Sequence, residues 1–210
     1  NNRIYGLTKG QYSPTSEVGK VTKATPMGSI DIPLNPPSLA LGAQATFVAR
    51  TIDRWQKHLS AMMERSYQHD GGSFLEIYQN CNIFNDGAFE EYTGKEKLDN
   101  VIELENGKPM LFARETKGIK LEGSKAIVVS MDDCSIEDLL VHDETDLDMA
   151  HIIANWTSNP QLPEPIGVIY CVDRPTYNQD MVDQINSAKK KKGKGSVQGL
   201  LNAGDTWVVD

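Results

Sequence analysis

The sequence predicts an α/β protein, with a parallel sheet flanked by helices in its first half and an α+β extension after it. Thr46–Ala49 has the composition of a short buried strand, residues 55–67 carry apolar side chains at helical spacing, and Ser73–Tyr78 has the composition of a second strand. A strand–helix–strand unit joins two parallel strands, which favours a layered α/β architecture. The later strands are short and separated by turn signals, so we expect a mixed extension.

The segment before this unit is rich in turn-forming residues. Residues 6–37 carry many Gly, Pro, Ser and Thr residues, and a connector of this length is uncommon in a compact domain unless it is functional or mobile. A helix is expected over residues 38–45, because helix-forming residues follow a proline pair there.

The helix over residues 55–67 carries its apolar side chains at a helical period and meets a stop signal at Gly71-Gly72. His58 and His69 occupy polar positions of this segment. We therefore expect both histidines at the surface.

The middle of the chain predicts a β-hairpin. Val101–Glu105 and Pro109–Ala113 flank Asn106-Gly107, which is a favoured two-residue turn. Pro109 cannot donate to a sheet, so its strand is expected at an edge. Ala126–Met131 has the composition of a further strand.

The last third predicts a helix followed by three further elements. Thr145 with Asp148 three residues later matches a capping box, and the helix that follows carries Met149 and Trp156. The acidic residues between His142 and His151 fit a helix N-terminus better than a metal site. The pattern then predicts a strand, a helix and a terminal strand, over Ile166–Val172, Gln179–Lys192 and Thr206–Val209.

Composition excludes several classes of protein. The chain has 210 residues, with 29 acidic and 21 basic ones and a formal net charge of −8. This charge disfavours nucleic acid as a partner, because phosphate binding needs a cationic face. No apolar run reaches the roughly 20 residues that span a bilayer, and no secretory signal pattern begins the chain. Three widely separated cysteines suit a reducing compartment, so we expect a cytoplasmic protein without membrane or nucleic-acid partners.

Two segments carry residues that simple packing does not explain. Asn1–Gln11 places paired asparagines and then glycines after the presumed end of a strand, where ligands of open α/β sheets bind. Asparagine and carbonyl oxygens there suit Mg²⁺, although Asn-Asn before a turn is also an ordinary turn sequence. Tyr78–Asp86 places Cys81 just past a strand among asparagines. An iron–sulfur cluster needs about four cysteines, so Cys81 alone does not define one.

Four segments in order resemble one family. NNRIYGLTKGQYSPTS, NPPSLALGAQATFVART, KHL and FLEIYQNCNIFND are similar to the thiamine-diphosphate-binding beta subunit of 2-oxoacid:ferredoxin oxidoreductases, and most similar to the 2-oxoglutarate type. The resemblance is strong over residues 1–89 and looser through the rest of the chain. It implies a thiamine-diphosphate-binding fold, with the C-terminal half of that domain over residues 1–92 and the beta-subunit extension over residues 93–210.

The resemblance implies roles for individual residues. The Asn2 side chain and the Ile4 carbonyl match ligands of the Mg²⁺ that holds the diphosphate, and neighbouring residues of the same motif match cofactor contacts. Cys81 matches one ligand of a [4Fe–4S] cluster. Lysines in the LTKGQ and KHL segments match basic positions that face the active site. The cofactor contacts are Tyr5, Gly6 and Thr8, and the two lysines are Lys9 and Lys57.

This sequence departs from the family pattern at its start. The Gly-Asp-Gly half of the thiamine-diphosphate motif and an N-terminal CxxC are absent. We therefore expect a chain that begins inside a longer subunit and holds neither cofactor well alone. Asn2 and Cys81 are expected to meet at one rim of the sheet.

For the intact enzyme, the resemblance implies oxidative decarboxylation of a 2-oxoacid to an acyl-coenzyme A with reduction of ferredoxin, in a complex with an alpha subunit. Lys9 stands where pyruvate-type relatives tend to have no cation, which favours 2-oxoglutarate with its second carboxylate. A pyruvate- or indolepyruvate-type enzyme is one alternative. Another is a non-catalytic domain that assembles subunits, for which residues 115–210 are the best candidate.

Overall fold

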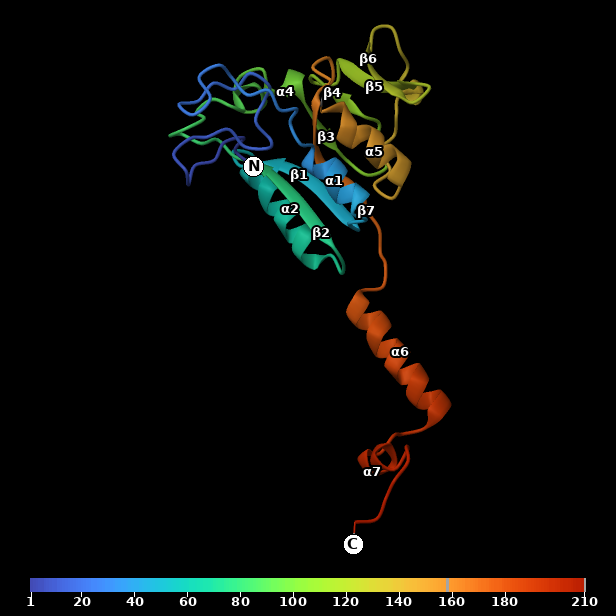
Figure 1. Ribbon diagram of the computed structural model, residues 1–210. Helices are drawn as coiled ribbons and strands as arrows, with labels where there is room; N and C mark the ends of the chain where they lie inside the picture. Colours follow the sequence, from blue (N-terminus) through green and yellow to red (C-terminus); the bar gives the residue numbers. More distant parts are fainter. Residues whose placement is uncertain (158, 210) are drawn as a thin grey trace. The chain divides into compact units, whose positions relative to one another are not determined.

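The computed structural model describes residues 1–157 and 159–209, in two compact units, Asn1–Asp173 and Arg174–Asp210. The first unit contains, in order, α1 (Pro36–Gly42), β1 (Phe47–Ile52), α2 (Gln56–Gln68), β2 (Ser73–Tyr78), α3 (Glu90–Thr93), α4 (Lys97–Asn100), β3 (Val101–Leu104), β4 (Leu111–Phe112), β5 (Lys117–Glu122), β6 (Lys125–Ser130), the 3₁₀ turn η1 (Ile136–Asp138), α5 (Leu147–Trp156) and β7 (Glu164–Cys171) (Figure 1). The second unit contains α6 (Tyr177–Lys192) and α7 (Val197–Leu201).

The main sheet has the strand order β2-β1-β7-β3. β1 and β2 are parallel, which confirms the strand–helix–strand prediction, and β3 is parallel to β7. β7 runs antiparallel to β1, a feature that periodicity does not reveal. Both β3 and β7 come after residue 92, yet they belong to the same sheet as β1 and β2. The division of the chain into residues 1–92 and 93–210 stays a prediction.

Helices cover both faces of the main sheet (Figure 1). On one face α2 packs Met62 against Phe47 and Ala49 of β1. On the other, Val48 joins a core with Ile153 of α5. Because successive side chains of a strand point to opposite faces, every residue of β1 is buried.

The predicted hairpin is wrong. Val101–Leu104 pairs with Glu164–Gly167 in the main sheet, whereas Leu111–Phe112 pairs with β5 in a separate antiparallel sheet, β4-β5-β6. The turn itself forms, with Lys108 N donating to Glu105 O at 3.1 Å. Burying the apolar residues of β3 beside β7 outweighs the local preference for a hairpin, since burial is the larger contribution to stability.

Two smaller predictions also need correction. Asp146, and not Thr145, caps α5, because its side chain accepts from Met149 N at 3.0 Å while the Thr145 hydroxyl donates to Asp143 at 2.7 Å. Thr206–Val209 is not a strand. Within the described part of the second unit the regular elements are helices, so that segment has no partner strand.

The two histidines of the α2 segment are half-buried instead of exposed. His58 Nδ1 lies 2.7 Å from Thr51 Oγ1, and His69 Nε2 lies 2.7 Å from Thr46 Oγ1. Both therefore face β1, because residues four and seven apart share one side of a helix with Met62. Burial lowers the pKa of His58.

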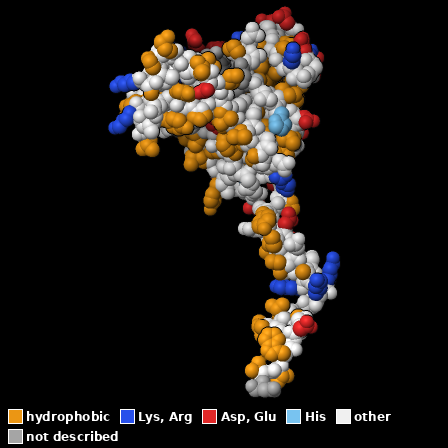
Figure 2. Space-filling model, in the orientation of Figure 1, with side chains coloured by type: hydrophobic (Ala, Val, Ile, Leu, Met, Phe, Trp, Pro, Cys, Tyr) orange, Lys and Arg blue, Asp and Glu red, His pale blue; other side chains and the backbone are white. Residues whose placement is uncertain are grey.

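The second unit has a charged end. Lysines gather in the last turn of α6, as Figure 2 shows, at Lys189–Lys192. Cations at this end of a helix interact favourably with its dipole. Across the described residues, no helix is long and apolar enough to cross a bilayer.

Candidate cofactor-binding site

The carboxyl ends of β1 and β2 form one rim of the main sheet. Asp53, which follows β1, accepts a hydrogen bond from Asn80 N at 3.2 Å through its side chain. Asn1 lies beside the end of β2, since its nitrogen donates to Ile77 O at 2.6 Å and its carbonyl accepts from Gln79 N at 3.0 Å. The first residues of the chain therefore run next to the end of the edge strand.

The first loop of the rim, Asn1–Gln11, closes on itself. Tyr5 N donates to Gln11 O at 2.8 Å, and Gly10 N donates to Tyr5 O at 2.9 Å. Lys9 and Gly10 have φ angles of 71° and 89°, a left-handed conformation that favours glycine. Ile4 is buried and anchors the loop, while Tyr5 and Lys9 are exposed. The loop thus presents its polar groups outward.

The oxygen donors of this loop fit the chemistry of Mg²⁺. The Asn2 side chain is half-buried, and its Oδ1 accepts a long hydrogen bond, 3.3 Å, from Ile4 N. An amide oxygen and a backbone carbonyl two residues on are both hard oxygen ligands. Within the described residues no group of three or more His, Cys, Asp or Glu could hold a metal.

The second loop, Gln79–Asp86, is folded by its asparagines. The Asn80 side chain donates to both Asn82 Oδ1 and Asp86 Oδ1 at 2.7 Å and accepts from Gly87 N at 2.9 Å. Side chains of this type favour turns because they mimic backbone hydrogen bonds. Cys81 is half-buried in this loop, and its carbonyl accepts from Asn85 N at 2.9 Å.

The two loops contact each other at two points. Asn85 Nδ2 donates to the Asn2 carbonyl at 2.9 Å. Phe84 lies so close to Gly10 that a Cβ there would come within 2.8 Å of the ring. Asn2 and Cys81 therefore lie on neighbouring loops of the same rim, as their positions after strands lead one to expect.

The two lysines have different surroundings. Lys9 lies in the exposed turn of the first loop. Lys57 is exposed in the first turn of α2 and lines a groove of about 860 Å³ together with Trp55, His58 and Lys97. Among the described residues that line this groove, none belongs to the first loop.

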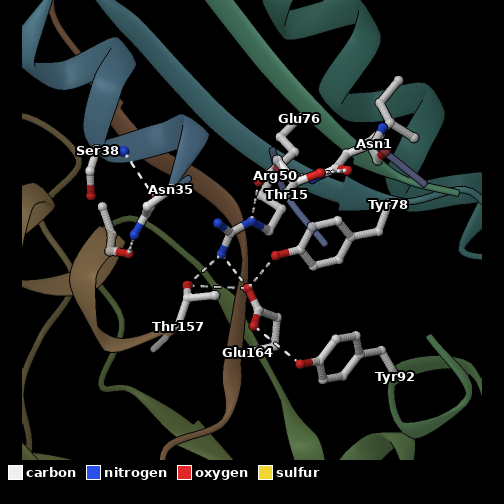
Figure 3. Close-up of polar contacts among 12 residues, drawn as sticks. Asn1, Thr15, Asn35, Ser38, Arg50, Glu76, Tyr78, Tyr92, Thr157 and Glu164 are labelled. Atoms are coloured by element: carbon white, nitrogen blue, oxygen red, sulfur yellow. Dashed lines mark hydrogen bonds and ion pairs between the residues drawn. The ribbon is translucent and has the colours of Figure 1, made fainter. Parts of the chain in front are cut away.

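A buried ionic network lies on the sheet face that α1 and α5 also cover (Figure 3). Arg50 of β1 is 1% exposed, and its Nε donates to Glu76 Oε2 at 2.8 Å. Its Nη1 donates to Thr157 Oγ1 at 2.9 Å and forms an ion pair with Glu164. Both carboxylates are buried, so the guanidinium is almost completely enclosed by its partners.

Two tyrosines complete the network. Tyr78 and Tyr92 donate to the two oxygens of Glu164 at 3.1 and 3.3 Å. Burial raises the pKa of Tyr78 well above its ordinary value, so its hydroxyl remains a donor. Although burial alone would lower it, the pKa of Arg50 is raised by Glu164 and Glu76, so the guanidinium stays charged.

The network also reaches the rim. Glu76 Oε1 accepts from the Asn1 side chain at 2.7 Å, and Asn1 Oδ1 accepts from Thr15 Oγ1 at 2.8 Å. A cavity of about 370 Å³ lies beside these residues, lined also by Arg3 and Asn35. The buried ion pairs therefore hold one side of the first loop.

Sequence reasoning missed this network, although a signal existed. Arg50 and Glu76 each stand inside a strand whose other residues are mostly apolar, and they are direct neighbours in the parallel register. Charged residues are rarely buried without a partner. A pair of opposite charges in adjacent buried strands was therefore the available clue.

Comparison with known proteins points to one family. The family model for the thiamine pyrophosphate enzyme, C-terminal TPP binding domain, matches residues 1–77. The chain is 42% identical to 2-oxoglutarate oxidoreductase subunit KorB of Mycobacterium tuberculosis, over 100% of this chain and 58% of that protein. It is 38% identical to 2-oxoacid:ferredoxin oxidoreductase subunit beta of Saccharolobus solfataricus, over 63% of this chain and 42% of that protein. The chain thus spans about half the length of these curated relatives.

A solved structure shares the fold. The 2-oxoglutarate:ferredoxin oxidoreductase from Magnetococcus marinus, solved with 2-oxoglutarate, coenzyme A and succinyl-CoA bound, superposes with a TM-score of 0.64. The match covers 96% of this chain and 55% of that chain, with 24% sequence identity. The α/β fold predicted from the sequence, with parallel strands in a sheet flanked by helices, is confirmed, whereas the separate extension stays a prediction.

Proposed function

We propose that the chain belongs to the family of 2-oxoacid:ferredoxin oxidoreductase beta subunits and that it forms the rim of a thiamine-diphosphate site in a 2-oxoglutarate-type enzyme. The complete enzyme would decarboxylate 2-oxoglutarate oxidatively, form an acyl-coenzyme A and reduce ferredoxin. The observation that carries the proposal is the contact between the Asn1–Gln11 and Gln79–Asp86 loops at one rim of the sheet.

The first loop would hold the diphosphate through Mg²⁺. Asn2 Oδ1 and the Ile4 carbonyl would supply two of the oxygen ligands, with the others from parts of the complete subunit outside this chain and from the diphosphate. Tyr5, Gly6 and Thr8 would contact the cofactor. Thiamine diphosphate supplies the carbanion chemistry and the electron sink that decarboxylation of a 2-oxoacid needs.

The second loop would serve electron transfer. Cys81 would give one thiolate to a [4Fe–4S] cluster, whose other ligands would lie outside this chain. Its half-buried position after β2 suits a ligand that must be reachable by a cluster yet shielded from bulk water. Since the two loops touch, electrons from the substrate would have a short route to the cluster and on to ferredoxin.

The lysines would act on the substrate. Lys9 carries an exposed ammonium group in the turn of the proposed diphosphate loop, where it could pair with the distal carboxylate of 2-oxoglutarate. Lys57 lies in the first turn of α2, directly after the carboxyl end of β1, and would add positive potential for an anionic substrate.

The same proposal assigns partners and a location. An alpha subunit would complete the active site and the coenzyme A site, and ferredoxin would dock to collect electrons. Residues 93–210 would form the beta-subunit extension after the thiamine-diphosphate half-domain, and the assembly would work in the cytoplasm. The charge of −8 is consistent with the absence of nucleic acid among these partners.

The proposal is tested on the complete subunit, purified together with its alpha subunit. Ferredoxin reduction is measured with 2-oxoglutarate, pyruvate and indolepyruvate, with and without thiamine diphosphate and Mg²⁺. We expect reduction that requires both cofactors and is fastest with 2-oxoglutarate. Activity that is fastest with pyruvate would reassign the substrate, and the absence of any cofactor-dependent activity would refute the enzyme function.

A further inference from the structure

One buried asparagine joins the two loops of the rim. The backbone N–H of Asn85 donates to the Cys81 carbonyl at 2.9 Å, and its side-chain Nδ2 donates to the Asn2 carbonyl at 2.9 Å. A longer contact of 3.5 Å reaches the Arg3 carbonyl. Asn85 is 6% exposed, so these hydrogen bonds are shielded from water and strengthened by the low dielectric.

We propose that Asn85 is a positioning residue that couples the Mg²⁺–diphosphate loop to the loop of the cluster cysteine. This inference rests on the proposed function, in which Asn2 and Cys81 serve the two cofactors. Asn85 itself touches neither cofactor in this proposal. It fixes the backbone on which each ligand stands, and a shift of one loop is thereby passed to the other.

The orientation of the Asn85 amide is set by a charged neighbour. Lys20 Nζ donates to Asn85 Oδ1 and also pairs with Glu17 at 2.9 Å. An ammonium group can only donate, so the oxygen of the amide must face Lys20. The Nδ2 group must then face Asn2, which makes the hydrogen bond between the loops directional.

The neighbouring residue supports the same contact by packing. Phe84 lies against Gly10, whose lack of a Cβ leaves room for the ring and whose φ of +89° independently favours glycine. Asn85 therefore holds the start of the first loop while Phe84 packs on its turn. The contact made by Asn85 is a hydrogen bond, so a single substitution that replaces its donor group with an acceptor turns the attraction into repulsion.

The test uses Asn85→Asp in the complete oxidoreductase complex. Aspartate has the same size and still accepts from Lys20, but its second oxygen faces the Asn2 carbonyl, where a donor is needed. We expect the Kd of the apo complex for thiamine diphosphate with Mg²⁺, measured by calorimetric titration, to rise about tenfold. We also expect the electron paramagnetic resonance spectrum of the reduced cluster to change in line shape.

Asn82→Asp is the matched control, because it puts the same charge on the same loop at an exposed position. Asn82 accepts through an oxygen that aspartate retains, so its Kd for the cofactor should stay within about twofold of wild type. In Asn85→Asp, an unchanged Kd or an unchanged cluster spectrum overturns the coupling, since both loops must respond.

Two further variants distinguish failure of the proposed function from failure of the coupling. A Cys81→Ala complex that keeps its cluster refutes the ligand assignment in the proposed function. If Cys81→Ala lacks the cluster but Asn85→Asp has the wild-type Kd and spectrum, only the coupling is overturned. If Asn85→Asp does not assemble, Lys20→Met decides, because it releases the amide orientation while keeping Asn85. If Lys20→Met changes both the cofactor Kd and the cluster spectrum, by less than is expected for Asn85→Asp, the coupling is supported. If either the Kd or the spectrum is unchanged, the coupling is overturned.

Discussion

The rim of the main sheet and its buried face carry polar groups in opposite states. At the rim, the Asn1–Gln11 loop presents Lys9 and Tyr5 to solvent and holds Asn2 Oδ1 in a long hydrogen bond of 3.3 Å from Ile4 N. On the face, Arg50 is enclosed by two carboxylates that are each less than 5% exposed. The polar groups of the rim are therefore available to a ligand, whereas the charged groups of the buried face are already paired with one another.

This difference separates residues that we assign to function, at the rim, from residues that we assign to stability, on the buried face. A buried charge that loses its partner destabilises the fold strongly, whereas an exposed charge contributes little. Substitutions at the rim should therefore change cofactor and substrate binding while the fold survives. Substitutions in the network should change the free energy of unfolding first.

The largest effect is expected for Cys81→Ala at the rim. Loss of one thiolate should remove the absorbance and the electron paramagnetic resonance signal of the cluster from the complete complex, while circular dichroism shows a preserved fold. Cys134→Ala is the matched control, because Cys134 lies in another loop, near Ser135 and Asp138. A cluster that persists in Cys81→Ala would contradict the assignment.

In the network, Arg50→Met should lower the free energy of unfolding by about 3–5 kcal/mol, because Glu76 and Glu164 would remain buried without their cation. Urea denaturation of the chain measures this change. Arg54→Met, at an exposed position four residues later, should change it by no more than about 0.5 kcal/mol. Equal changes in the two variants would show that the network does not stabilise the fold.

At the rim again, Lys9→Ala should lower kcat/KM for 2-oxoglutarate about tenfold or more and leave 2-oxobutyrate nearly unaffected, because only the first substrate has a second carboxylate. Steady-state ferredoxin reduction by the complete complex measures both. Lys23→Ala removes another exposed lysine of the N-terminal segment and serves as the control. Equal losses for the two substrates would remove Lys9 from substrate recognition.

The smallest effect is expected from two histidines that belong to neither region. Burial lowers the pKa of His58 and of His142, so the unfolded chain binds protons more readily than the folded one. The free energy of unfolding should therefore fall as the pH drops below about 6.5 and level off below the lowered folded-state pKa values. His58→Gln should flatten this profile in urea denaturation, and a profile that rises toward acid would contradict the sign.

Sequence patterns predicted the elements whose signals are local. The strand predicted at 46–49 is observed at 47–52, the helix predicted over 55–67 is observed over 56–68, and the strand predicted at 73–78 has those bounds. The rim loops follow from their places after the strands. The capping residue of α5 was missed by one position, because Asp146 and Thr145 are both good caps and only the backbone geometry selects one.

Features that depend on distant segments could not be read in the same way. The antiparallel direction of β7 and its pairing with β3 place Glu164 beside Arg50 across 114 positions of sequence, and no local pattern encodes that approach. The same pairing removed Val101–Leu104 from the predicted hairpin. The contact between Asn85 and Asn2 likewise depends on how two loops meet, although each loop was singled out separately.

The central claim is that one rim brings the diphosphate metal and the cluster close together, and a spin-coupling measurement tests it directly. Mn²⁺ replaces Mg²⁺ in the complete complex with thiamine diphosphate bound, and the Mn²⁺ resonance is recorded with the cluster oxidised and then reduced. We predict that reduction of the cluster broadens the Mn²⁺ signal through dipolar coupling, and that Cys81→Ala abolishes this response. A Mn²⁺ signal that is identical in both redox states would contradict the account.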